Sequence, residues 1–347
     1  MTSFFCPHPF AFMEFSLGGN VFCCCPAHVQ RPLGNLREQT IDEIWNGEVA
    51  QKMRHEIINH RWEAVCKPSC PVVQEYLYKG KVRNLGSFVS NTEVLDRITQ
   101  HINNKETELK TLPTVFNFAN TTTCNINCIM CSCKKAPAEP ELLEKSVEYV
   151  NSHLATTSRI VLTGSGDPLA CATIRKLLTG NDHTTPSTDT KFTLLTNGLL
   201  LPKYWDAIKH NSFSTIDVSV DAGTAETYEM IRRNARWSDL NEALRLISDN
   251  RSKFNSVGIN MTVMKENYAE IPQFIELGIK YDIPVRFNEV RTAGDLDAES
   301  NIFSNQDGHH FKNFLTVIAR AQQKEYPVAV NWGNLLQYAR NASAHAQ

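Results

Sequence analysis

Short runs of β-branched and aromatic residues alternate with helical segments over the last two thirds of the chain. Six such runs predict strands at 114–120, 159–164, 191–196, 215–220, 257–263 and 284–290. The segments between them repeat apolar residues at helical spacing, and this alternation indicates parallel βα units. Six strands are fewer than the eight of a closed barrel. We therefore expect an α/β fold with a partial (β/α)6 TIM-like barrel, whose ligand groups lie on the loops after the strands.

The beginning of the chain has a different pattern. Its clearest element is one predicted helix over residues 40–58, which Thr40 can cap at the amino terminus. A loop-rich segment of this kind has too little core to fold alone, and a bound metal would supply the missing stability. We expect a small, loop-rich domain at 1–80, a helical linker at 81–112, and the barrel with a C-terminal extension at 113–347.

Charge and hydropathy narrow the classes of partner. The chain of 347 residues has 35 Lys and Arg against 37 Asp and Glu, a formal net charge of −2. Without a long basic block, nothing favours nucleic acid or an anionic membrane surface, so a small-molecule or peptide substrate is expected. No run of about 18 apolar residues is present, and the first residues lack the basic region of a secretory signal. We expect a cytoplasmic protein without a membrane span.

The cysteines point to metal or redox chemistry. Eleven cysteines are too sparse for a disulfide scaffold in a chain of this length, and a reducing cytosol would keep them as thiols. They form a front group, a central group and one outlier: Cys6, Cys23, Cys24, Cys25, Cys66 and Cys70, then Cys124, Cys128, Cys131 and Cys133, then Cys171. Two separate metal sites are therefore expected.

The central group places Cys124, Cys128 and Cys131 on the loop after the first predicted barrel strand, at C-x3-C-x2-C spacing. Structural zinc usually takes four ligands, and Cys133 could be the fourth, although one residue alone separates it from Cys131. Three thiolates suit a [4Fe-4S] cluster, because one of its four irons is then left to bind a cofactor or substrate.

This spacing on this loop resembles the cluster motif of the radical S-adenosylmethionine (radical SAM) superfamily, and the resemblance extends over residues 113–290. It implies that the three cysteines hold a [4Fe-4S] cluster, whose free iron binds the amino and carboxylate groups of S-adenosylmethionine. An electron from the cluster then cleaves the cofactor to methionine and a 5'-deoxyadenosyl radical, which removes hydrogen from the substrate.

The same resemblance implies cofactor contacts on the loops after the second, third and fourth strands. The loop after the second strand has a serine and an aspartate where the family has glycine and glutamate. The implied contacts are Gly164, Ser165, Gly166 and Asp167 for the methionine ammonium, Thr196 and Asn197 for the ribose, Ser219 for the ribose or carboxylate, Arg232 or Arg233 for the carboxylate, and Met130 for the adenine.

Residues 5–72 resemble the SPASM domain, an auxiliary iron-sulfur module of some radical SAM enzymes. The resemblance rests on Cys6, the turn that begins at Gly19, the stretch from Leu33, the helix from Glu43, and a closing cysteine pair. It implies a second [4Fe-4S] cluster, with these ligands: Cys6, Cys24, Cys66 and Cys70. Cys24 is assigned because a strand over 22–25 would turn Cys23 and Cys25 to the opposite face. The family carries this module after the barrel, whereas here it comes first.

A cluster with four thiolates has no open iron, so the front site would serve electron transfer or structure, and a purely structural zinc or cluster site is the alternative. Cys171 could donate a hydrogen atom to a substrate radical, as an epimerase requires, or it could be a small core residue. The resemblance implies a radical SAM oxidoreductase or epimerase that acts on a sugar or other small molecule, and a flavodoxin or ferredoxin-type reductant. The alternatives are a peptide-modifying radical SAM enzyme, a non-catalytic zinc or iron-sulfur interaction protein, and an enzyme that uses S-adenosylmethionine as a methyl donor.

Overall fold

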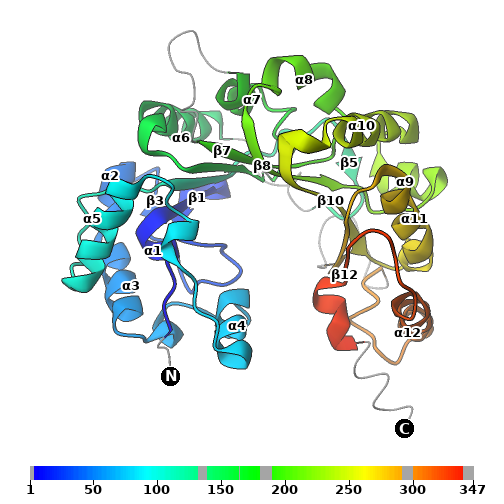
Figure 1. Cartoon of the computed structure of the whole chain (residues 1–347), viewed down its shortest axis with the longest axis horizontal. Coiled ribbons are helices and arrows are strands. Elements are labelled where there is room, and N and C mark those ends of the chain that lie inside the picture. The colour runs from blue at the N-terminus through cyan, green and yellow to red at the C-terminus, as the bar shows by residue number, and fades with distance from the viewer. Residues whose placement is uncertain (1–3, 132–138, 164, 180–189, 291–299, 339–347) are drawn as a thin grey trace. The chain divides into compact units, whose positions relative to one another are not determined.

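The computed structural model describes residues 4–131, 139–163, 165–179, 190–290 and 300–338. Its contacts divide the chain into two compact units (Figure 1). Unit 1 comprises Met1–Thr121, Ala138–Ser165 and Ala172–Thr193, and unit 2 comprises Thr122–Pro137, Gly166–Cys171 and Leu194–Gln347. This division crosses the ranges expected from the sequence, so the three-part organisation of 1–80, 81–112 and 113–347 stays a prediction. Within the described residues, no helix is long and apolar enough to cross a membrane.

All six predicted strands form. They are β4 (Val115–Ala119), β6 (Arg159–Leu162), β7 (Lys191–Thr196), β8 (Ser212–Ser219), β10 (Phe254–Val263) and β11 (Val285–Glu289). The ladders that join β4 to β6, β8 to β10, and β10 to β11 are parallel, and helices connect the strands, as parallel βα units require. The prediction of an α/β fold built on a partial barrel of parallel strands is confirmed.

In unit 1 the strand order is β6-β4-β1-β2-β3. The three strands that the sequence did not predict are β1 (Phe12–Ser16), β2 (Asn20–Phe22) and β3 (Gly34–Asn35). β1 runs parallel to β4, with Glu14 opposite Asn117, and β2 then pairs antiparallel to β1. A strand from the cysteine-rich beginning of the chain therefore extends the sheet at the edge of the first barrel strand.

One face of this sheet is apolar and the other is polar. On the apolar face, the rings of Phe15 and Phe116 stack at 6.1 Å, and Phe116 meets Tyr149 of α6. On the opposite face, Asn117 donates to the Glu14 carboxylate at 2.8 Å and accepts from the Thr163 hydroxyl at 2.9 Å. The helices of unit 1 are α1 (His8–Ala11), α2 (Ile41–Trp45), α3 (Glu48–Ile58), α4 (Pro71–Lys79), α5 (Thr92–Asn103), α6 (Pro140–Ser152) and α7 (Ala172–Thr179).

The predicted single helix at 40–58 is wrong, because α2 and α3 are separate helices. Thr40 caps α2 as expected, and Glu43 completes the reciprocal capping box. The break follows from Gly47, which adopts an extended conformation as the N-cap of α3. The buried Arg54 side chain stabilises the junction between α2 and α3 by donating to the carbonyls of Pro9 and Trp45.

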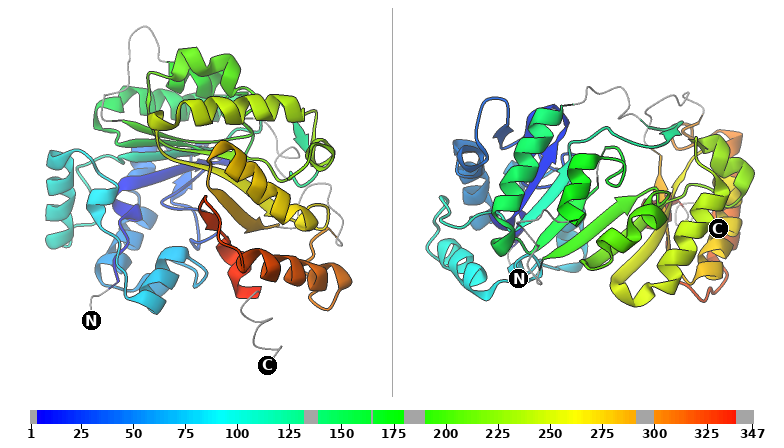
Figure 2. Two further views of the ribbon diagram at one scale, coloured as in Figure 1. Left: turned by 45° about the vertical axis from the view of Figure 1, so that its right-hand side comes forward. Right: turned by 90° about the horizontal axis from the view of Figure 1, so that it is seen from above.

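In unit 2 the strand order is β12-β11-β10-β8, and β12 (Val330–Asn331) is parallel to β11. Helices α10 and α11 lie side by side along one face of these strands (Figure 2). On this face, the ring of Phe274 on α11 lies 5.5 Å from the ring of Phe287 on β11. The helices of unit 2 are α8 (Leu201–Ile208), α9 (Ala225–Ile231), α10 (Trp237–Asp249), α11 (Ile271–Tyr281) and α12 (His309–Gln322). β7 is divided between the units after residue 193.

Candidate iron-sulfur and cofactor sites

The loop that carries the three central cysteines is fixed by a short ladder in unit 2. β5 (Asn127–Cys128) pairs antiparallel with β9 (Arg232–Arg233), which follows α9. The amide of Ile129 also donates to the carbonyl of Ile231 at 2.9 Å. The middle cysteine therefore lies on hydrogen-bonded backbone, which gives the loop a defined shape before any ligand binds.

The three central thiols are reduced and lie close enough to influence one another. Cys124 is exposed, whereas Cys128 and Cys131 are half-buried. Burial raises the pKa of Cys128 to about 11, and the neighbouring Cys124 and Cys131 thiols also act in the raising direction. Since the thiolate is the form that binds metal, cluster assembly on this loop has to displace protons.

Arg232 is buried beside the cluster loop and already has a carboxylate partner. Its guanidinium donates to Asp221 at 2.5 Å and to the carbonyl of Val220 at 3.0 Å, and a third nitrogen lies 3.9 Å from the Cys128 sulfur. Burial acts to lower the pKa of Arg232, but the Asp221 carboxylate and Cys128 raise it overall. The structure thus places Arg232 at a ligand sulfur, and its pairing with the methionine carboxylate stays a prediction.

Asp167 joins two of the predicted cofactor loops. Its side chain, which is 1% exposed, accepts from the Thr196 hydroxyl at 2.7 Å, from the Asn197 amide at 2.7 Å and from the Leu169 amide at 2.9 Å. Burial raises its pKa, and these hydrogen bonds act in the lowering direction. Both carboxylate oxygens are thus engaged inside the protein, and the contact of Asp167 and the loop carbonyls with a methionine ammonium stays a prediction.

Gly166 lets the same loop pack directly against the cluster loop. An added Cβ would lie 2.1 Å from the carbonyl oxygen of Thr123, the residue before Cys124, and the Asp167 amide donates to that oxygen at 2.8 Å. The sequence predicted that this glycine frees the backbone to approach a ligand. The close approach that the structure shows is to the chain itself.

Gly166→Ala should therefore displace one of the two loops, because the atoms that the new methyl group meets are backbone. Overpacking of this kind costs roughly 1–3 kcal/mol, and we expect a lower denaturant midpoint together with a lower iron content after reconstitution. Gly86→Ala is the matched control, since its Cβ would meet no atom closer than 3.4 Å. Wild-type values for both measurements in Gly166→Ala would contradict the packing described here.

Thr196 and Asn197 were expected to bond ribose hydroxyls, but both are buried and engaged within the site. The Asn197 side-chain amide donates to Asn125 at 2.9 Å and lies 3.8 Å from the Cys124 sulfur. The Thr196 hydroxyl donates to Asp167 and accepts from Gly198. Asn197 thus holds the amino-terminal end of the cluster loop. The contact of Thr196 and Asn197 with a ribose stays a prediction.

The remaining predicted contacts are scattered. Ser219 is half-buried at the end of β8 and lies opposite Asn260, and Met130 is half-buried on the cluster loop. In unit 1 the Ser165 hydroxyl donates to the carbonyl of Ala119 at 3.1 Å. Cys171, which is 5% exposed, immediately precedes α7. Gly164 and Cys133 lie outside the described residues.

Five front cysteines gather in unit 1 around one small buried pocket. The pocket is lined by Cys6, Cys23, Cys24, Cys66 and Cys70, together with His8, His28 and apolar side chains. All four predicted ligands are therefore brought together, whereas Cys25 is exposed and lies outside the lining. The predicted strand over 22–25 is wrong, because β2 ends at Phe22 and the chain bends there. Cys23 consequently faces the same pocket as Cys24.

The closing pair has the electrostatics of a metal-binding thiolate. Cys70 is the N-cap of α4, and a hydrogen bond from the Cys66 thiol lowers its pKa to about 5, aided by the amides of Val73 and Val72. Cysteines at helix N-termini commonly show this shift. Burial raises the pKa of Cys6 to about 12, and its sulfur lies 3.3 Å from Nδ1 of His8.

The donor sets of the described thiols fit iron-sulfur clusters. A zinc ion needs its ligands about 2.0–2.3 Å away. A cluster lies between its thiolates, so its ligands stand farther apart than those of one ion. Three thiols at the central loop and four or five at the front pocket match that donor set.

Sequence reasoning missed several residues at these sites. Asp221 holds Arg232 from the left-handed region at φ 64°, and Asn125 accepts from Asn197. An aspartate directly after a buried strand was the available signal for Asp221.

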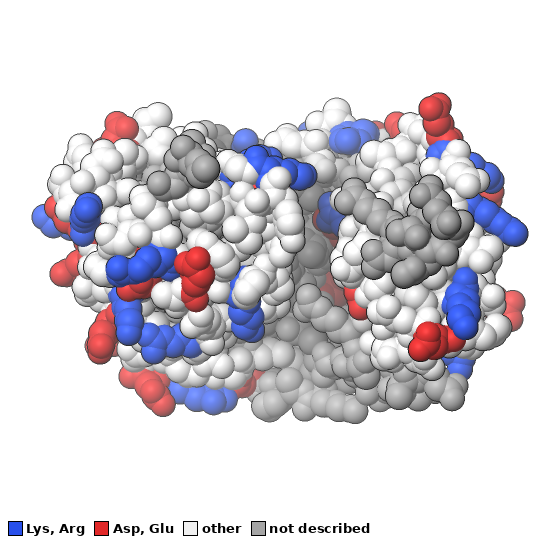
Figure 3. Space-filling model, turned by 90° about the horizontal axis from the view of Figure 1, so that it is seen from below, with Lys and Arg blue, Asp and Glu red and all other residues white. Residues whose placement is uncertain are grey.

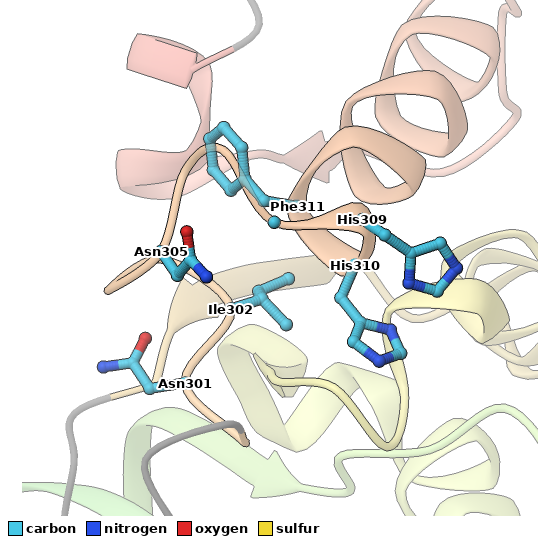
Figure 4. Close-up of a pocket in the computed structure, with 7 residues that line it drawn as sticks. Asn301, Ile302, Asn305, His309, His310 and Phe311 are labelled. Atoms are coloured by element: carbon cyan, nitrogen blue, oxygen red, sulfur yellow. The ribbon is translucent and has the colours of Figure 1, made fainter.

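A cavity of about 260 Å³ at the start of α12 was also not predicted. Figure 4 shows His309 and His310 on the first turn of this helix. Asn301, Ile302 and Asn305 lie on the segment before it.

Comparison with known proteins gives matches at both cysteine-bearing regions. The model of the radical SAM superfamily matches residues 121–278, and the model of the SPASM iron-sulfur cluster-binding domain matches residues 6–71. These ranges contain the cluster loop and the five thiols of the front pocket, respectively.

Curated relatives include two GTP 3',8-cyclases. The protein from Petrotoga mobilis is 31% identical over 181 residues, which are 50% of this chain and 54% of that protein. The protein from Alkaliphilus oremlandii is 29% identical over 205 residues, or 55% of this chain and 62% of that protein. This chain thus spans little more than half the length of these relatives.

Solved structures with a similar arrangement include Streptococcus suis SuiB bound to S-adenosylmethionine, which is 14% identical with a TM-score of 0.46 over 82% of this chain and 63% of that chain. Another is anSMEcpe with bound AdoMet, at 17% identity and a TM-score of 0.45 over 62% of this chain and 60% of that chain. The family matches confirm both resemblances found in the sequence, including the [4Fe-4S] clusters and S-adenosylmethionine as cofactors. The chain carries a SPASM iron-sulfur domain at residues 6–71 ahead of a radical SAM domain at residues 121–278.

Proposed function

We propose that this protein is a cytoplasmic radical SAM enzyme that removes hydrogen from a small polar substrate, leading to its oxidation or epimerisation. When bound, the cluster supplies an electron that cleaves S-adenosylmethionine to methionine and a 5'-deoxyadenosyl radical, which takes a hydrogen atom from the substrate. The observation that carries the proposal is the central loop of unit 2, where the β5–β9 ladder fixes Cys128 and the Cys124 and Cys131 thiols lie close enough to act on its pKa.

The protein's own residues hold this centre in shape. Cys124, Cys128 and Cys131 are the proposed ligands, and side-chain donors from Asn197 and Arg232 point at the first two sulfurs. Hydrogen bonds to ligand sulfurs orient the ligands and adjust the reduction potential of a cluster. The ligand loop is thus supported from two neighbouring loops of unit 2.

A polar face of the unit 2 sheet supports a small, hydroxyl-rich substrate. Ser219, Asn260 and Arg286 lie in register on three adjacent strands, so their side chains leave the same face. The Arg286 side chain is 47% exposed and is held by Asp217 at 3.4 Å. The opposite face is apolar and covered by helices. A face of this kind can bind hydroxyl and anionic groups of a sugar or a nucleotide.

The relatives and the surface agree with a small-molecule substrate. The curated relatives are named as GTP 3',8-cyclases, so their substrate is a nucleotide. On the face shown in Figure 3, acidic and basic side chains are interspersed, so this face offers no extended basic surface for a nucleic acid.

If the product is an epimer, Cys171 is the proposed hydrogen donor. We also propose a reductant of the flavodoxin or ferredoxin type.

Anaerobic reconstitution followed by dithionite and S-adenosylmethionine tests the proposal. We expect about eight irons and eight sulfides per chain and formation of 5'-deoxyadenosine. About two zincs per chain without that product would instead support a non-catalytic binding protein. S-adenosylhomocysteine in place of 5'-deoxyadenosine would overturn the proposal in favour of methyl transfer. Deuterium transfer into 5'-deoxyadenosine from labelled sugars or nucleotides supports the substrate class, and transfer from labelled peptides alone contradicts it.

A further inference from the structure

The carboxyl end of α4 exposes two large apolar side chains next to each other in unit 1. Leu77 is 54% exposed and Tyr78 is 78% exposed, more than any other large apolar side chain in the described residues. The other side of α4 is well packed, since Val72 and Val73 are buried and Tyr76 meets the ring of Phe4 at 5.2 Å. The helix is therefore anchored by its inner side, and its exposed pair is typical of an interaction site.

The same end of the helix carries a surplus of positive charge. Lys79 and Lys81 are exposed and follow the apolar pair directly, and Arg83 comes next. The Glu75 carboxylate lies near these cations, with its oxygens 3.2 Å from a guanidinium nitrogen of Arg83 and 4.0 Å from the Lys81 ammonium. We call Leu77, Tyr78, Lys79 and Lys81 the α4 tip. In a chain whose net charge is −2, this local surplus favours an acidic partner.

The α4 tip and the front cluster site lie at opposite ends of one short helix. The amino end of the same helix is Cys70, one of the thiols that line the front pocket. At 1.5 Å per residue, Tyr78 lies about 12 Å from Cys70 along the helix axis. A protein bound to the tip would therefore have its surface close to the thiolates that hold the front cluster.

We propose that the α4 tip docks a small acidic one-electron carrier protein of the flavodoxin or ferredoxin type, which gives one electron to the front cluster. The carrier is oxidised by one electron and the front cluster is reduced by one. The front cluster is reoxidised by passing that electron to the central cluster, where it is used to cleave S-adenosylmethionine. The proposal rests on the proposed function, because it needs a redox-active front site. A few aromatic and basic residues suit such a partner, since electron-transfer encounters bury less than about 1,200 Å² and tyrosine is frequent among the residues that dominate binding.

The experiment compares two reductants on tip variants. The variants are Leu77→Ser with Tyr78→Ser, and Lys79→Glu with Lys81→Glu. Ile279→Ser with Lys280→Glu is the matched control, because it changes an exposed apolar residue and its exposed neighbouring cation on α11. Formation of 5'-deoxyadenosine is measured with flavodoxin and its reductase, and separately with dithionite, which needs no docking surface.

We expect both tip variants to lose about tenfold in the flavodoxin-driven rate at low carrier concentration, which corresponds to about 1.4 kcal/mol of binding. Their dithionite-driven rates and front-cluster iron should equal those of the wild type, and the control should keep both rates. The wild-type rate with flavodoxin should also fall as salt rises, and the charge-reversed variant should lose most of that dependence.

Three results would overturn the proposal. An unchanged flavodoxin-driven rate in both tip variants would show that the carrier docks elsewhere. An equal loss with both reductants would show that the tip serves the fold or the substrate, including a peptide substrate. If the wild type forms no 5'-deoxyadenosine even with dithionite, the proposed function fails first and the docking role fails with it. The dithionite arm thus separates failure of the enzyme from failure of the docking surface.

Discussion

Cys128→Ala is expected to abolish the formation of 5'-deoxyadenosine from S-adenosylmethionine and dithionite. Cys128 is the middle ligand of the proposed trio, and the β5–β9 ladder fixes the backbone at its position. Loss of one thiolate from a centre that has three leaves the cluster with two protein ligands. Product is measured by chromatography, and iron should fall by about four per chain, the content of one [4Fe-4S] cluster.

The controls for this variant lie in the front pocket. Cys23→Ala should still form 5'-deoxyadenosine, because the Cys23 thiol is not on the central loop and donates to the Met53 sulfur at 3.7 Å. Cys24→Ala should lower front-cluster iron, and the exposed Cys25 should tolerate alanine. Equal loss of product in Cys128→Ala and Cys23→Ala would refute the ligand assignment.

Arg232→Ala should weaken both the fold of unit 2 and the hold on the central cluster. The substitution leaves the buried Asp221 carboxylate without its 2.5 Å cationic partner. Removing one member of a buried ion pair typically costs about 3–5 kcal/mol. It also removes the nitrogen that lies 3.9 Å from the Cys128 sulfur. Denaturant unfolding should show the loss of stability, and the reduced cluster should show an altered electron paramagnetic resonance signal or lower iron content.

The neighbouring arginine provides the comparison. Arg233→Ala removes an exposed cation from the same short strand and should change stability by no more than about 0.5 kcal/mol. Arg232→Lys keeps the charge but cannot reproduce the fork of donors, so it should fall between the two. If Arg232→Ala matched Arg233→Ala in stability and in the resonance signal, the ion pair would have no structural role.

The sequence predicted the barrel strands because each is a short run of β-branched and aromatic residues that lies between helical segments. β1 escaped prediction because it has a glutamate in its middle and forms its ladder with a strand about a hundred residues away. Pairing at that separation leaves no local signal. The break at Gly47 was missed for the opposite reason, since the helical spacing on both sides masked one residue's conformation.

The candidate sites were also predicted only in part. Spacing alone placed Cys124, Cys128 and Cys131 on one loop, and the structure brings them together. The roles of Asp167, Asn197 and Arg232 could not be predicted, because each depends on a partner that only the fold supplies. Their polar side chains mark the right loops, yet the contacts that they make are with the cluster loop and with one another.

The pairing of β1 with β4 has a consequence for solubility. An uncovered strand edge presents a row of free amides and carbonyls that invites another chain to add on, and natural proteins blunt such edges with short or interrupted strands. Here the edge of the first barrel strand is sealed from within the same chain, and the sheet then tapers through three-residue β2 to two-residue β3. The cysteine-rich beginning of the chain thus covers the edge of β4 and keeps another chain from pairing with it. This effect does not depend on the front cluster.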